Sequence, residues 1–274
     1  MSAAPVNGQW GLLTKFGNVI KPREGAMLSV LSSGYAREYD DTKSGSTDFV
    51  DGKALYKNDP TAAGGTQTGA APAGFPKAAK GCMQDNKVND MIDVKLTLTA
   101  PKDATGFQFD FNFYSSEWPN WVCSNFNDAF VAYLTSSTVK GDNISFDSNN
   151  NPVAVNNNFL NRCTDKTDIG CGPTATLVSP GTPTGKSMCA AGTGELAGTG
   201  FDDPQPTACD SMQTASVGGA TGWLTTQAPI APGETFTLEF MIWDAGDGVL
   251  DSSVLIDNFQ WIGGTVSTGT SRVN

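Results

Sequence analysis

Histidine is absent from this sequence of 274 residues. Its absence excludes Ser-His-Asp and Cys-His nucleophile systems, and it also excludes the usual zinc sites that contain histidine. Any acid–base chemistry would have to use carboxylates, lysine, tyrosine or cysteine.

Basic residues and long apolar runs are also scarce. The chain has 17 Lys and Arg against 28 Asp and Glu, which gives a formal net charge of −11. Such a surface repels nucleic acid and anionic lipid, so we expect no nucleic-acid partner. It keeps an extracellular protein soluble, and its carboxylates can also bind Ca²⁺. The chain contains no run of 18 apolar residues, so we predict no membrane-spanning segment.

The compartment is indicated by the cysteines and by the start of the chain. None of the six cysteines lies in a C-x-x-C pair, so we expect up to three disulfides and an oxidising compartment, with free buried thiols as the alternative. The 15 possible pairings leave the connectivity open. The first residues lack the basic and apolar regions of a signal peptide, so we expect a mature secreted form with an added Met1. The cysteines are Cys82, Cys123, Cys163, Cys171, Cys189 and Cys209.

Alternation of apolar and polar residues predicts β-strands. Residues 91–99 place four aliphatic side chains on one face, and residues 106–114 place four phenylalanines on one face and Gln108, Asp110 and Asn112 on the other. The phenylalanines imply a thick core between packed sheets. We predict an all-β fold, a two-sheet antiparallel sandwich of jelly-roll type. Further strands are expected at 27–34, 128–134, 153–155, 223–226, 235–243, 250–256 and 259–262.

A single domain is expected over residues 1–265. Residues 40–84 are rich in Gly, Ala, Thr and Lys and predict a long loop. Residues 156–215 predict a long insertion that disulfides organise, and residues 266–274 predict a polar C-terminal tail.

Two segments carry a family resemblance. Residues 109–130 contain Ser-Ser-Glu-Trp and then Phe-Asn-Asp-Ala-Phe, and residues 232–258 contain Pro-Gly-Glu-Thr, Asp-Ala-Gly-Asp and Asp-Ser-Ser-Val. These motifs resemble the choice-of-anchor L domain of bacterial surface proteins, although Ser116 stands where a first glutamate is common. The resemblance implies export and surface display, with adhesion as the expected role, and names no ligand or reaction.

The first candidate calcium loop lies between two core strands. Its oxygen-bearing side chains are Glu117, Asn125, Asn127 and Asp128. A folded loop can bring several such oxygens together, as Ca²⁺ requires. The alternative is that Asn127 and Asp128 cap turns by accepting backbone N–H groups.

The second candidate calcium loop contains Asp244, Asp247 and Asp251. Carboxylates so close together repel one another unless a cation or hydrogen-bond donors intervene. The sequence is therefore compatible with two interpretations of this loop, a calcium site and a structural clamp made of hydrogen bonds.

Two tryptophans, Trp118 and Trp121, lie on the first loop. Exposed tryptophans can stack on sugars or anchor a protein partner. The alternative is that one or both fold back over the edge of the core.

Three functions are compatible with these features. The first is an extracellular surface-binding or adhesion module, stabilised by calcium, that recognises a glycan or a protein. The second is a subunit that assembles with copies of itself into an extracellular filament or matrix. The third is a glycoside hydrolase that pairs Glu117 with Asp128 or Asp244, but nothing in the sequence requires it and we expect no enzyme.

Overall fold

The computed structural model describes residues 9–36, 69–118, 121–160, 163, 189–201, 203–204, 216–248 and 250–273. These residues form antiparallel sheets and a short 3₁₀ helix, η4 (Gly192–Gly194), and they contain no α-helix. Among them, no helix has the length and hydrophobicity that crossing a membrane requires.

The larger sheet has seven strands in the order β1-β2-β13-β4-β11-β14, and β10 pairs with β4 beside this path. Every pairing in it is antiparallel. The strands are β1 (Trp10–Leu13), β2 (Leu28–Ser32), β4 (Gly106–Ser115), β10 (Gly219–Ala220), β11 (Leu224–Pro229), β13 (Ser252–Ile262) and β14 (Gly269–Arg272).

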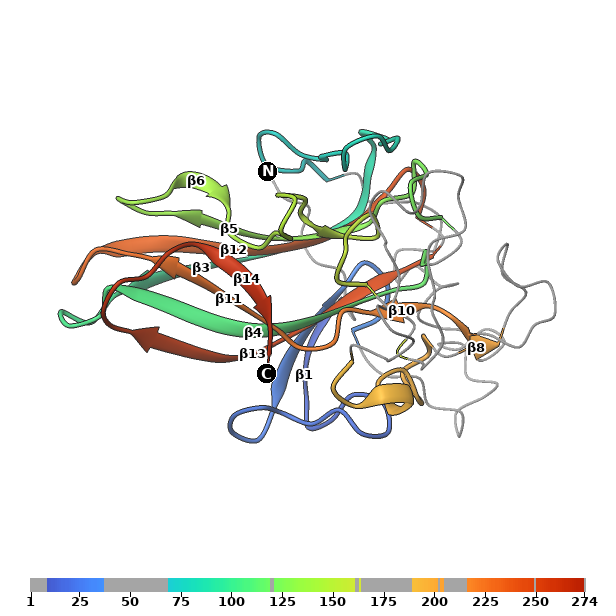
Figure 1. Cartoon of the computed structure of the whole chain (residues 1–274), viewed down its shortest axis with the longest axis horizontal. Coiled ribbons are helices and arrows are strands. Elements are labelled where there is room, and N and C mark those ends of the chain that lie inside the picture. Colours follow the sequence, from blue (N-terminus) through green and yellow to red (C-terminus); the bar gives the residue numbers. More distant parts are fainter. Residues whose placement is uncertain are drawn as a thin grey trace.

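The smaller sheet has five strands in the order β3-β12-β5-β6, and β7 pairs with β5. Figure 1 shows the two sheets packed face to face. The strands are β3 (Val88–Thr99), β5 (Ala129–Thr135), β6 (Lys140–Asn143), β7 (Val153–Ala154) and β12 (Thr235–Ala245), and β8 (Asp203–Pro204) and β9 (Ser216–Val217) form a separate pair.

The core lies between the two sheets. Phe109 of β4 lies edge-on to Phe240 of β12, with ring centroids 5.0 Å apart, and Phe111 is 5.0 Å from Phe130 of β5. All four phenylalanines of β4 are fully buried, which confirms the predicted sandwich. They are Phe107, Phe109, Phe111 and Phe113.

The opposite face of β4 is also covered, so Asp110 and Asn112, which the alternation places outward from the phenylalanine core, are buried as well. Asn112 is fully buried and donates to Glu195 Oε1 at 2.5 Å, and Asp110 accepts from Arg23 Nε at 2.6 Å. A second apolar cluster, which includes Phe16, Tyr114, Phe201 and Leu255, lies on this side.

Three sequence predictions need adjustment or fall outside the described residues. The expected strands at 250–256 and 259–262 are one strand, β13, with a register shift between Asp257 and Gln260. The expected polar tail contains β14, which pairs with β11. Most of the predicted loop at 40–84 and of the insertion at 156–215 lies outside the described residues.

Disulfides join Cys82 to Cys123 and Cys163 to Cys189. Cys171 and Cys209 lie outside the described residues.

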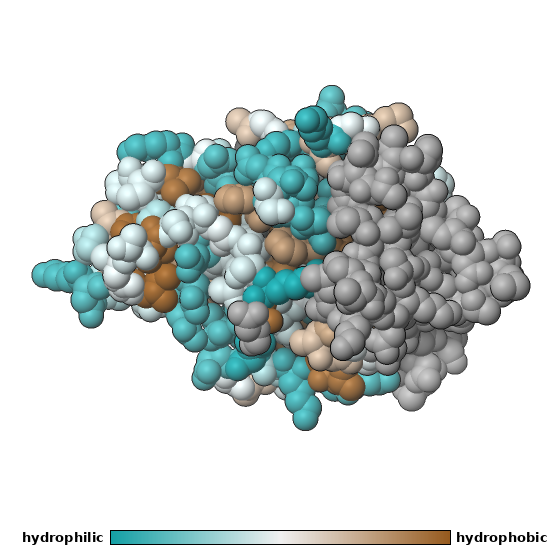
Figure 2. Space-filling model, viewed as in Figure 1, coloured by the Kyte–Doolittle hydropathy of each residue, from teal (hydrophilic) through white to brown (hydrophobic). Residues whose placement is uncertain are grey.

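Hydrophilic residues cover most of the described surface in the view of Figure 2, and hydrophobic residues form scattered patches. Trp10 and Leu12 on β1 are 58% and 57% exposed.

Candidate metal centre

Four buried carboxylates lie in one region, where strands of both sheets begin or end, and they are near enough for neighbours among them to raise one another's pKa values. Glu117 follows β4, Asp128 precedes β5, Asp244 lies near the end of β12, and Asp251 precedes β13. Each is at most 3% exposed. We call these four residues the carboxylate cluster. The structure thus joins in one place the two calcium loops that the sequence presented as separate.

Strand pairing explains why these distant residues meet. β4 and β13 pair Ser115 with Ser252, which brings the residues beside them together, and the Ser116 N–H donates to the Asp251 carbonyl at 3.2 Å. In the smaller sheet, Asp244 lies opposite Asn89 after a register shift in β12. The pairing of the strands therefore brings the four carboxylates together, and no single loop contains them all.

The two central carboxylates differ in their hydrogen bonds. Asp128 Oδ1 accepts the Ala245 N–H at 3.0 Å, and its Oδ2 accepts the Ser252 hydroxyl at 2.7 Å. Among the described residues, neither oxygen of Asp244 has a hydrogen-bond partner within bonding geometry, and neither does Oε2 of Glu117. Because unpaired buried charges are costly, the cluster needs protons or a cation.

Burial is the main cause of the pKa shifts in the cluster. It raises the pKa of Asp128 to about 7, partly offset by the hydrogen bonds that Asp128 accepts. It raises the pKa values of Glu117 and Asp244 well above the usual range, and neighbouring carboxylates add to both shifts. The nearby Ser33 hydroxyl partly offsets these effects and lowers the pKa of Asp244. The Ser33 hydroxyl does not form a hydrogen bond of good geometry with Asp244, because it donates to the Ser252 carbonyl.

Sequence reasoning missed several buried oxygens beside the cluster. Asn89 Oδ1 and Ser116 Oγ are buried and find no hydrogen-bond partner in the part of the chain that the structure describes. Asp90 is fully buried, and its charge raises the pKa of Asp244. The signal available in the sequence was an Asn-Asp pair immediately before the alternating strand at 91–99.

A glycine leaves room for one of the four carboxylates. A Cβ atom at Gly34 would lie 2.1 Å from Asp251 Oδ2. The end of β2 therefore approaches the cluster closely only because residue 34 has no side chain.

The other predicted calcium ligands lie in three different settings. Asn127 accepts the Asn156 N–H at 2.8 Å and donates to Gln84 Oε1 at 2.8 Å, an arrangement that favours the structural interpretation. Asn125 is exposed. Asp247 is partly exposed, and its charge raises the pKa values of Glu117 and Asp128.

The two tryptophans are also placed differently. Trp118 is fully buried in the core, so in this conformation it presents no face to a ligand. Trp121 is 41% exposed and packs edge-on against Phe126 with ring centroids 5.0 Å apart. The disulfide between Cys82 and Cys123 anchors the same loop.

The choice-of-anchor L domain family matches residues 30–260. The chain belongs to the choice-of-anchor L domain family. This places it among bacterial surface-associated proteins. No curated protein and no solved structure gives a significant match to the chain.

The donor set of this choice-of-anchor L domain consists of oxygen atoms, which suit a hard cation such as Ca²⁺ or Mg²⁺ rather than Zn²⁺ or Cu²⁺. Within the described ranges, no three or more Asp, Glu, His or Cys side chains form a ready-made metal site. Ca²⁺ accepts six to eight ligands in flexible geometry, including carbonyls, amides and water. The unpaired oxygens of Asp244, Glu117, Asn89 and Ser116 therefore fit Ca²⁺ better than Mg²⁺, which requires near-ideal octahedral geometry.

Proposed function

We propose that this choice-of-anchor L domain is a calcium-stabilised binding module of the bacterial cell surface, which recognises a glycan or a protein. The observation that carries the calcium part is Asp244, a carboxylate only 2% exposed whose oxygens, among the described residues, have no donor other than a proton that it could share with the neighbouring carboxylate of Asp128. The neighbouring carboxylates Asp128 and Asp251 raise the pKa of Asp244 further, because they add negative charge beside it.

A cation in the cluster would act as a structural clamp. Its ligands come from strands of both sheets, so one ion would tie the ends of β4, β12 and β13 together. It would also fix both ends of the loop between Glu117 and Asp128, which carries the exposed Trp121. The proposed role of calcium is therefore to hold a surface loop in one shape for binding.

The cluster does not support the hydrolase alternative. Glu117, Asp128 and Asp244 are at most 3% exposed, whereas a glycosidase must bring a sugar between its two carboxylates. Burial of this extent leaves no path for a substrate in this conformation.

A calcium titration of the EDTA-treated protein tests the proposal. We expect calcium to raise the melting temperature, because a ligand that binds only the folded state stabilises it by about 2.7 kcal/mol at a hundredfold excess over Kd. Asp244→Asn should abolish most of this rise.

Asp110→Asn is the matched control. Asp110 is also 2% exposed, but it is paired with Arg23. This variant should melt at a lower temperature and keep the full calcium response. An unchanged melt of the wild-type protein across the calcium titration would refute the calcium part.

Self-assembly has one observation in its favour. The edge strand β1 exposes Trp10 and Leu12, and an apolar sheet edge is a surface on which another chain can pair. Light scattering after size exclusion tests this function, since a wild-type monomer at high concentration contradicts it. If the protein does assemble, Trp10→Ser should shift it towards the monomer.

A further inference from the structure

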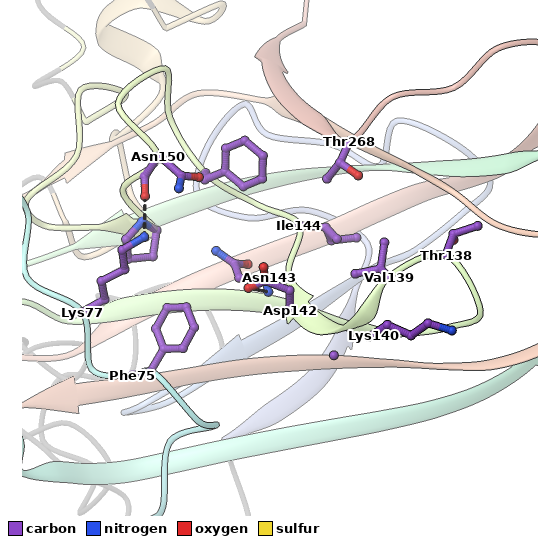
Figure 3. Close-up of a pocket in the computed structure, with 13 residues that line it drawn as sticks. Phe75, Lys77, Thr138, Val139, Lys140, Asp142, Asn143, Ile144, Asn150 and Thr268 are labelled. Carbon is purple, nitrogen blue, oxygen red and sulfur yellow. Dashed lines mark hydrogen bonds between the residues drawn. The ribbon is translucent and has the colours of Figure 1, made fainter.

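A polar cleft of about 510 Å³ lies beside β6, the edge strand of the smaller sheet. Its lining comes from β6 with its preceding turn, from the turn at 146–152, and from Phe75, Lys77 and Thr268. In Figure 3, Lys77 and Lys140 lie at opposite ends of the labelled group, with Asp142 between them. We call this feature the β6 cleft.

The walls of the β6 cleft are held by hydrogen bonds within the chain. Asn143 donates to the Ser145 carbonyl at 2.7 Å and accepts the Ser145 N–H at 3.0 Å. Asp147 Oδ1 accepts the N–H groups of Asn149 and Asn151 at 2.8 and 2.9 Å. The cleft is therefore already formed, so a ligand would not have to order it.

The lining combines aromatic rings with polar groups that keep spare hydrogen-bonding capacity. Phe75 and Phe146 are both partly exposed. The Lys77 ammonium donates to the Asn150 carbonyl at 2.9 Å, which leaves donors for a ligand. Asp142 Oδ1 accepts the Asn143 N–H, and among the described residues Oδ2 of Asp142 makes no hydrogen bond.

This chemistry selects among ligand classes. Seven polar side chains line the cleft against five apolar ones, so an apolar ligand would leave donors and acceptors unpaired. A nucleic acid is disfavoured by the net charge of −11. A polyhydroxylated molecule matches both the polar groups and the apolar phenylalanine rings of the lining, because sugar rings are hydrophobic on one face and bear hydroxyls at their edges.

An extended peptide is the main competitor, because it could pair with the edge of β6. That edge is irregular: the register shifts between Leu134 and Thr135 on β5, and Gly141 within β6 has a φ of 90°. Irregularities of this kind blunt an edge for strand addition. The observations therefore favour a saccharide.

We propose that the β6 cleft binds a short segment of a polysaccharide. This inference rests on the proposed role as a surface-binding module, and it assigns the ligand class and its place. No residue of the carboxylate cluster lines the cleft, and β6 pairs with Tyr133, about 17 Å along β5 from Asp128, although Phe75 at the other side of the cleft packs against Trp243. Saccharide binding should therefore depend little on calcium.

An oligosaccharide array followed by calorimetry tests the proposal. The array carries neutral glucose and mannose oligomers, N-acetylglucosamine oligomers and uronic acid oligomers, with a peptide library as the competing class. We expect one saccharide class to bind. Asp142→Ala and Lys77→Ala, both at exposed positions, should each weaken its binding about tenfold through lost hydrogen bonds.

Two variants serve as matched controls. Lys102→Ala and Asp103→Ala remove the same charges from an exposed turn that does not line the cleft, and they should leave the affinity unchanged.

Phe75→Leu is a third test of the cleft itself. It keeps an apolar side chain but removes the ring, and it should weaken saccharide binding as Asp142→Ala and Lys77→Ala do.

Three results would overturn the proposal: no saccharide binds, only peptides bind, or binding is lost in Trp121→Ala and retained in the cleft variants. A second measurement separates this inference from the calcium proposal. Saccharide binding without a calcium response in thermal melts would refute only the calcium part. A calcium response without saccharide binding would refute only the β6 cleft.

Discussion

In a calcium-free buffer, the free energy of unfolding of this domain should fall as the pH rises from about 5 to about 8. The pKa of Asp128 is raised from 3.8 to about 7 in the folded protein, so between these values the folded state holds a proton that the unfolded chain has released. The pKa values of Glu117 and Asp244 are also raised. Raising the pH through about 7 removes the proton of Asp128 and leaves buried charge, which destabilises the fold.

The size of the effect follows from the pKa shift. For Asp128 alone, a rise from 3.8 to about 7 corresponds to about 4 kcal/mol over the whole span between these two values, of which about 3 kcal/mol is lost between pH 5 and pH 8. This is a large part of the roughly 5–15 kcal/mol by which most domains are stable. Calcium should reverse the trend, because a carboxylate must lose its proton to bind the ion.

Urea denaturation followed by tryptophan fluorescence measures both trends, in EDTA and in millimolar calcium. The buried Trp118 and Trp243 provide the signal. Asp244→Asn gives an independent check: in EDTA at pH 8 it should be more stable than the wild type, since a neutral amide replaces an unpaired carboxylate. Parallel pH profiles in the two buffers would refute the reasoning, as would a less stable Asp244→Asn protein under these conditions.

Three further variants test the fold and the assignment of Asn127, each by urea denaturation. Replacing Cys82 and Cys123 together by serine opens a loop with a sequence separation of 41 residues and should cost about 4 kcal/mol; a loss below about 1 kcal/mol would show that this loop is not constrained as described. Asn127→Ala removes the acceptor of the Asn156 N–H and should cost about 1–3 kcal/mol with no change in the calcium response; a lost response would make Asn127 a ligand. Phe111→Ala leaves a cavity between the sheets and should cost about 3–5 kcal/mol, and a near-neutral result would contradict the packing of β4.

Local alternation was sufficient to predict the long core strands and the sandwich, whereas short strands such as β6 and β14 were missed. The phenylalanine face of β4 and the alternating strands β3 and β12 follow directly from a period of two residues. The second buried face of β4 could not be predicted in this way. Asn112 is covered because Glu195, 83 positions away, reaches its amide, and the segment around Glu195 has no periodic pattern.

Four residues of the carboxylate cluster were identified as candidate ligands from the sequence, but their position in one common region was not predicted. Asp128 and Asp244 were identified from their own loops, but no pattern in the sequence indicates that the two loops lie together. Their meeting depends on β4 pairing with β13, which only the folded topology reveals. Asp90 was missed for a local reason, since an Asn-Asp pair before a strand is also typical of a turn.

The order of strands in the two sheets decides when the domain can fold. β4 takes both of its main partners, β11 and β13, from the C-terminal part of the chain, and β12 from the same part joins β3 to β5. During synthesis, neither sheet can close before residues 224–262 exist, and pairings so distant in sequence form slowly. This order suits a surface-associated protein, because the chain stays open until its last strands arrive. A chain truncated before β11 would expose the phenylalanines of β4 and should aggregate rather than fold in part.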